Sequence, residues 1–82
     1  MILTGKITSI LSDNSGDGWR RVEYLVNTGG EYAKDVKVSA SKDGVINGLK
    51  VGNTYDLNIE LSAREYNGKY YNDVRVWKYE AK

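Results

Sequence analysis

The sequence contains no cysteine and no histidine, and these two absences exclude several kinds of site. Without cysteine, no disulfide can stabilise the fold and no thiolate can act as a nucleophile or metal ligand. Without histidine, the chain lacks the commonest general base and the commonest metal ligand. No serine has a plausible base partner, and no acidic residues fall in a recognisable acid–base motif. The sequence therefore favours a protein that is not an enzyme and that uses no cofactor.

The chain also lacks a strong excess of charge of either sign. It has 12 Lys and Arg against 11 Asp and Glu, a formal net charge of +1. The charge is unevenly spread, because residues 43–63 carry a balance of −2 and residues 64–82 a balance of +2. This local positive region permits nucleic-acid binding, but ordinary solvated strand faces explain it equally well.

No apolar run approaches the length that spans a membrane. The first residues lack the basic region and apolar core of a signal peptide. These absences favour a cytoplasmic protein with no membrane partner. At 82 residues, the chain is expected to form one small domain over residues 1–82, with a core that must be economical.

Five runs rich in Val, Ile, Thr, Tyr and Trp alternate between apolar and polar residues, with Gly, Asn, Asp and Ser between them. They predict strands over residues 2–11, 19–28, 31–41, 55–62 and 70–79. Within the first run, the alternation slips between Ile7 and Ile10, which indicates a bulge or a strong bend. The segment between the third and fourth strands breaks the alternation and contains several glycines, so we expect one helical turn or an irregular plug there.

Five strands with a plug between the third and the fourth predict an all-β OB-fold, which is a five-stranded Greek-key barrel. A closed barrel would also hide the edges that a short sheet exposes. The alternative is a small open sandwich or an SH3-like barrel. The alternation assigns inward positions on the last two strands to Leu57, Ile59, Leu61, Tyr70, Val74 and Val76. It assigns the outer face of the fifth strand to Tyr71, Asp73, Arg75, Trp77 and Tyr79.

The most informative stretch is residues 64–77, which places three tyrosines, a tryptophan and three cations around Asn67-Gly68. An Asn-Gly pair between alternating runs is the strongest short-range hairpin signal, because both residues accept positive φ. Bases stack on aromatic faces, and phosphates attract Lys and Arg. The sequence therefore predicts a tight hairpin with side chains suited to single-stranded nucleic acid.

Several motifs in this chain resemble a short family of bacterial and phage-like OB-fold proteins catalogued as a domain of unknown function. The motifs are the first-strand run Thr4–Ile7, the basic run Trp19–Arg21, the stretch Ser62–Gly68 and the strand Arg75–Trp77. The stretch that begins at Leu49–Asn53 and continues through the last two strands is similar to the C-terminal half of bacterial single-stranded DNA-binding proteins. The resemblance covers nearly the whole chain. It implies an OB barrel that binds single-stranded DNA in DNA replication and forms a homo-oligomer, either a dimer or a tetramer.

The predicted site combines stacking residues with phosphate-binding residues. The stacking candidates are Trp19, Tyr66, Tyr71 and Trp77. The phosphate candidates are Arg21, Lys37, Arg64, Lys69 and Arg75. We predict binding of single-stranded DNA with little sequence preference and with steep salt dependence.

Two other functions remain open for the same residues. The outer aromatic row that includes Tyr71 and Trp77 could be a subunit interface in a protein-interaction module, because Trp, Tyr and Arg are enriched in interface hot spots. Single-stranded RNA binding would use the same stacking.

The loop that begins at Asp13 resembles the start of a calcium-binding loop, with Ser15 and Asp17 at alternate positions. The twelfth position is Tyr24 rather than the bidentate glutamate that closes such a site. A polar turn explains these residues, so no metal site is predicted.

Overall fold

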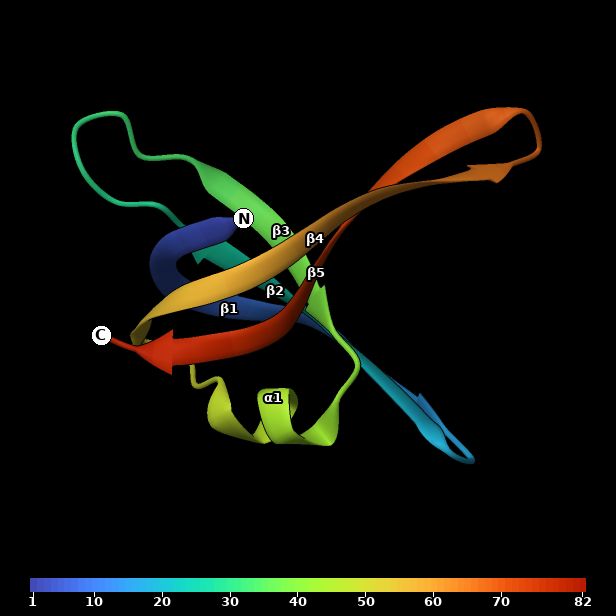
Figure 1. Cartoon of the computed structure of the whole chain (residues 1–82), viewed down its shortest axis with the longest axis horizontal. Helices are drawn as coiled ribbons and strands as arrows, with labels where there is room; N and C mark the ends of the chain where they lie inside the picture. The colour runs from blue at the N-terminus through green and yellow to red at the C-terminus, as the bar shows by residue number, and fades with distance from the viewer.

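The computed structural model describes residues 1–82 and shows five strands closed into a barrel, with a short helix at one end (Figure 1). The elements are β1 (Ile2–Gly16), β2 (Trp19–Asn27), β3 (Asp35–Ala40), α1 (Asp43–Gly48), β4 (Thr54–Tyr66) and β5 (Lys69–Ala81). The strands follow one another in the order β1-β2-β3-β5-β4, and β4 returns to β1. The predicted OB-fold, with its helical plug between β3 and β4, is therefore confirmed.

All five strands and the plug contribute to a core of 13 buried residues. Alternation explains the clearest part of this core, because Val22, Tyr24 and Val26 of β2 all point inward and are at most 1% exposed. The plug adds Val45, Ile46 and the neighbouring Leu49, which are also buried. The helix α1 has six residues, and the structure contains no membrane-spanning helix.

The predicted irregularity of the first strand is confirmed. The pairing of β1 with β2 shifts register twice, between Ile7 and Ser9 and between Ile10 and Ser12. Before these bulges β1 pairs with both neighbours, while after them it pairs with β2 alone. Bulges bend and twist a strand, so they let β1 serve two sides of the barrel.

The plug is fastened by Tyr55 at the start of β4. Its hydroxyl donates a hydrogen bond to the carbonyl oxygen of Gly48 (3.0 Å) and accepts one from the backbone N–H of Lys50 (2.8 Å). The ring of Tyr79 meets Tyr55 edge to face at 5.6 Å and also covers Gly48, where a Cβ atom would overlap the Tyr79 ring. Glycine is therefore required at this contact, and three elements are joined at one point.

The first two strands extend beyond the barrel as a long β-arm. Residues 13–16 were expected in a loop, but they are strand, and only the Asp17-Gly18 pair forms the turn. The register runs to the tip, where Gly16 lies opposite Trp19. The polar residues of this segment pair across the hairpin instead of forming a coil, which their side chains alone did not indicate.

The last two strands form a second β-arm, which diverges from the first on the same side of the barrel (Figure 1). Its tip is the predicted Asn67-Gly68 turn, with φ values of 52° and 79°. The expectation that Leu61 and Tyr70 are buried is wrong, because they are 56% and 72% exposed. Alternation places both on the core side, but the arm has already left the barrel at these positions.

The expected outer position of Tyr79 is also wrong, because β5 contains a bulge at Trp77. Asn58 pairs with Lys78 and Ile59 pairs with Val76, so Trp77 has no partner on β4. One extra residue shifts the alternation, and Tyr79 therefore packs against the core on the same side as Val76.

Candidate nucleic-acid interface

A polar groove of about 420 Å³ lies where the base of the β4–β5 arm meets β2 and β3. β2 contributes Arg21 and Glu23 because the alternate residues Val22 and Tyr24 point into the core. The groove is lined by Arg21, Glu23, Lys37, Arg64, Tyr71, Asn72 and Asp73. The sequence-predicted residues Arg21, Lys37, Arg64 and Tyr71 are thus brought together from four strands.

Glu23 lies between two of the predicted phosphate ligands. Its carboxylate accepts a hydrogen bond from the Ser12 hydroxyl (2.8 Å), and its other oxygen lies 3.4 Å from Nζ of Lys37 and 3.9 Å from Nη2 of Arg21. The Ser12 hydrogen bond holds the pKa of Glu23 below its usual value, with further help from the Lys37 and Arg21 charges, while partial burial opposes the shift. The groove therefore holds an ionised carboxylate beside its cations at neutral pH.

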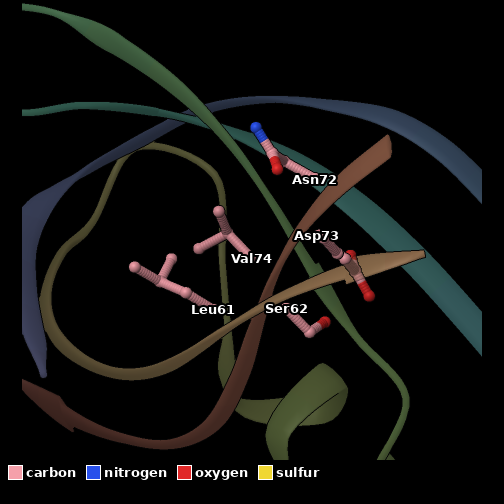
Figure 2. A pocket seen from close by; sticks show the side chains of 6 residues that line it. Leu61, Ser62, Asn72, Asp73 and Val74 are labelled. Carbon is pink, nitrogen blue, oxygen red and sulfur yellow. The ribbon is translucent and has the colours of Figure 1, made fainter. Parts of the chain in front are cut away.

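Asp73 provides the second carboxylate of the groove. Its Oδ1 atom lies 3.2 Å from Nη2 of Arg21 and accepts a hydrogen bond from the hydroxyl of the buried Ser39 (3.2 Å). Figure 2 shows Asp73 and Ser62 on one side of the β4–β5 pair, with Leu61 and Val74 on the other. These bonds join the base of the arm to β2 and β3, so they position the arm relative to the barrel.

The five predicted phosphate ligands fall into two groups. Arg21 and Lys37 lie beside the carboxylates of the groove, and Arg75 is paired with Glu60 on the outer face of the sheet (2.8 Å). Arg64 and Lys69 on the β4–β5 arm form no salt bridge; the salt bridges of the chain involve other cations. Arg64 and Lys69 are therefore the predicted cations most available to a phosphate.

Two of the three tyrosines on the β4–β5 arm flank Arg64. Tyr71, which is 52% exposed, lies directly opposite Arg64 in the β4–β5 register and lines the groove. Tyr66, which is 67% exposed, lies two residues from Arg64, opposite Lys69 at the tip. Tyr66, Arg64 and Tyr71 also line one further hollow on the arm. The outer face of this arm thus alternates rings with cations.

The two tryptophans lie outside the groove. Trp19 is 56% exposed on the β1–β2 arm and lies across Gly16, where a Cβ atom would come 2.8 Å from Cε2 of the indole. It lines a separate hollow that also includes Ser41 and Asp43. Trp77 is 47% exposed at the β5 bulge and lines none of the hollows described here. The predicted row of Tyr71, Arg75 and Trp77 is therefore not one continuous surface within the groove.

Sequence reasoning missed Glu23, Ser39 and Asp73 as parts of the site. The alternation of β2 was sufficient to place Glu23 beside Arg21, since residues two apart share a face. Nothing local indicated the contacts of Asp73, because its partners Arg21 and Ser39 lie 52 and 34 residues away.

The closed five-stranded barrel and its plug define an OB-fold protein, with a groove between the β4–β5 arm and the β2–β3 face. The fold is similar to that in the crystal structure of a small single-stranded DNA-binding protein from Streptomyces coelicolor. The TM-score is 0.60 at 11% sequence identity, over 100% of this chain and 92% of that one.

The family follows from residues 2–80, which match the family described as Domain of unknown function (DUF3127). The chain belongs to this family, which confirms the predicted membership of an OB-fold family of unknown function. A search of curated proteins finds no match.

Proposed function

We propose that this protein binds single-stranded DNA without catalysing a reaction, and that it shows little sequence preference. The observation that carries the proposal is the pairing of exposed Tyr71 with Arg64 across the β4–β5 arm at the groove. A ring that can stack on a base lies beside a cation with no acidic partner, as stacking and phosphate contact together require.

The strand would run along the outer face of the β4–β5 arm and into the groove. Bases would stack on Tyr71 and Tyr66, while phosphates would meet Arg64 and Lys69. Every base has an aromatic face, so stacking alone discriminates poorly among sequences. The fold shared with a solved protein described as binding single-stranded DNA supports the same class of ligand.

The test is a titration of labelled oligo-dT at low salt with wild-type protein and the Tyr71→Ala variant. Loss of one stacking ring is expected to weaken binding by about 1–3 kcal/mol, roughly 5- to 150-fold. Tyr32→Ala is the matched control, because Tyr32 is 82% exposed in the loop between β2 and β3 and lines neither the groove nor the arm hollow. The proposal is wrong if wild type at micromolar concentration binds no oligo-dT, or if it prefers duplex DNA.

Trp77 favours a second function, that of an assembly module. This large ring is exposed at a bulge outside the groove, and tryptophan is a frequent anchor of protein interfaces. Light scattering on wild type and Trp77→Ala, with oligo-dT binding measured in parallel, separates the two functions. Loss of assembly without loss of DNA binding would assign Trp77 to a subunit interface.

RNA is the remaining candidate ligand, because the same rings can stack on unpaired RNA bases. Competition between DNA and RNA oligomers of matched sequence decides between the two ligands. Stronger displacement by RNA would replace DNA in the proposal.

A further inference from the structure

Closure of the barrel leaves the outer part of β4 with an unpaired edge. β4 pairs with β1 only from Thr54 to Asn58, and the next backbone N–H, that of Ile59, donates to the carbonyl oxygen of Met1 (2.9 Å). From residue 60 to residue 66, β4 has β5 on one side and no strand on the other. The expectation that the barrel hides its edges is therefore wrong for this arm, since an unpaired edge is a template for another strand.

The polar groups on this edge follow from the Ile59 hydrogen bond. Backbone groups of alternate residues point to opposite sides in an antiparallel sheet. Since Ile59 directs its N–H away from β5, the N–H and C=O groups of Leu61 and Ala63 point to the free edge as well. Those of Glu60, Ser62 and Arg64 point to β5.

The side chains at this edge separate into an apolar and a charged face. Leu61 is 56% exposed on the core side, above the half-buried Val74, and both line a hollow of about 420 Å³ (Figure 2). Glu60 and Arg64 lie on the outer face, four residues apart and on either side of Ser62. The free edge therefore presents an exposed leucine on one face and two opposite charges on the other.

We infer that residues 60–64 of β4 pair antiparallel with the same residues of a second copy, about a two-fold axis at Ser62. This register places Leu61 opposite Ala63 of the second copy, and Ala63 opposite its Leu61. It also places Glu60, which pairs with Arg75 of its own chain, opposite Arg64 of the second copy. This contact occurs twice because the interface is symmetric. Opposite charges and apolar pairs directly across a sheet are stabilising.

The neighbouring registers are less favourable. An axis at Ala63 places Leu61 opposite Glu65, while an axis at Leu61 needs the Ile59 N–H that already bonds to Met1. An axis midway between two neighbouring residues would pair a residue whose backbone groups point to the free edge with one whose groups point to β5, so the hydrogen bonds could not form. Glu60 and Arg64 thus attract their counterparts in the register centred on Ser62, whereas charged residues at an edge usually discourage pairing with other strands. This difference makes a second copy the specific partner of the edge.

The contact is short. It contains two hydrogen-bonded residue pairs. The area that it buries is therefore far smaller than the roughly 1,200 Å² or more that stable interfaces bury. We therefore expect weak self-association that does not require DNA, and a covalent trap is the suitable measurement.

The trap is Ser62→Cys, which creates the only thiol in the chain. At the two-fold axis the two Cα atoms would lie about 4.5 Å apart, within the roughly 4.4–6.8 Å that a disulfide spans. Mild oxidation without DNA is expected to convert most of the protein to a disulfide-linked dimer. Ser15→Cys is the matched control on the β1–β2 arm, because Ser15 is also an exposed serine near the end of an arm. Its variant is expected to cross-link at least about fivefold more slowly.

A charge reversal tests the register. In the Ser62→Cys background, Arg64→Glu places like charges opposite each other and should reduce the cross-linking rate at least about threefold. Lys69→Glu makes the same charge change on the same arm outside the paired segment and should leave the rate unchanged. Equal rates for Ser62→Cys and Ser15→Cys, or equal effects of the two reversals, would overturn the inference. Because no DNA is present, this outcome is independent of the oligo-dT titration.

Discussion

Glu23 controls how much of the positive charge in the groove is available to a ligand. Lys37 and Arg21 both lie near its carboxylate, and Ser12 holds that carboxylate in place with a hydrogen bond. A phosphate entering the groove must therefore compete with a fixed negative charge. Arg64 has no such competitor, so it is the residue whose loss should weaken phosphate binding most directly.

The lowered pKa of Glu23 makes stability depend on pH. Because the folded-state pKa lies below the unfolded-state value, ionised Glu23 stabilises the fold above the unfolded pKa, and this contribution is lost as pH falls through the folded pKa. Ser12→Ala removes the main cause of the shift, so it should lower the free energy of unfolding at pH 7 by about 1 kcal/mol. The loss should shrink as the pH falls through the folded-state pKa of Glu23.

Urea denaturation of wild type and Ser12→Ala at pH 7 and pH 3 measures this effect. Ser15→Ala is the control, because Ser15 is exposed and forms no side-chain hydrogen bond. Asp13, whose pKa is lowered by its hydrogen bond with Arg20, contributes an acid-dependent loss in all three proteins. A difference between wild type and Ser12→Ala that is the same at both pH values would contradict the role given to Glu23.

The sequence predicted the site only to the extent that alternation assigns each side chain to one face of its strand. Alternation placed Arg21 and Tyr71 on outer faces, where the structure has them. It could not show that Arg21 meets Asp73, because that contact depends on how β5 crosses β2 and β3. Three of the five predicted phosphate ligands form ion pairs. The pair of Arg21 is long-range, and those of Lys37 and Arg75 join neighbouring strands.

Among the elements, the plug depends on one hydroxyl. Tyr55→Phe removes the donor to Gly48 and leaves the Lys50 N–H without its acceptor. An unsatisfied donor costs about 1–3 kcal/mol when fully buried, and this hydrogen bond is partly buried, so we expect the free energy of unfolding to fall by about 1 kcal/mol. Tyr66→Phe is the control, because its hydroxyl lies at the exposed tip of the arm with no hydrogen-bond partner in the chain. Equal urea midpoints for the two variants would show that these bonds do not hold the plug.

The existence of the five strands and of the plug was predictable, but the lengths of the arms were not. Leu61 continues the apolar alternation of Ile59, and Tyr70 lies on the same side as Val74 and Val76 with only Asn72 between them. The sequence predicts which face of a strand a side chain occupies. Its burial also depends on whether the barrel core lies next to that face. The sequence also gives no sign of the bulge at Trp77. Because of this bulge, Tyr79 packs against the core instead of lying on the predicted outer face.

On the scale of the whole molecule, the ion pairs of this near-neutral chain lead us to expect a more modest salt dependence of DNA binding than the steep one predicted from the sequence. For single strands, the slope of log affinity against log salt is about −0.7 per neutralised phosphate. Contact through Arg64 and Lys69 alone predicts a slope of about −1.4, whereas all five predicted cations would give about −3.5. We expect a value nearer the smaller one, because carboxylates already hold Arg21, Lys37 and Arg75.

Oligo-dT affinity measured across a salt series gives this slope directly. Glu23→Gln should steepen the slope by releasing Lys37, whereas Arg21 stays paired with Asp73. Glu31→Gln in the β2–β3 loop makes the same charge change away from the groove and should leave the slope unchanged. A wild-type slope as steep as that of five contacts would mean that DNA displaces the carboxylates on binding.

The two half-exposed indoles give the protein a built-in optical reporter. Trp19 lies on the β1–β2 arm beside Arg20, whereas Trp77 lies at a bulge away from the groove. The fluorescence of an indole responds to what covers it, so the emission of a Trp77→Phe variant would follow the arm alone and that of a Trp19→Phe variant the bulge alone. Two single-tryptophan proteins could thus report separately on what covers the β1–β2 arm and on what covers the β5 bulge, without any attached dye.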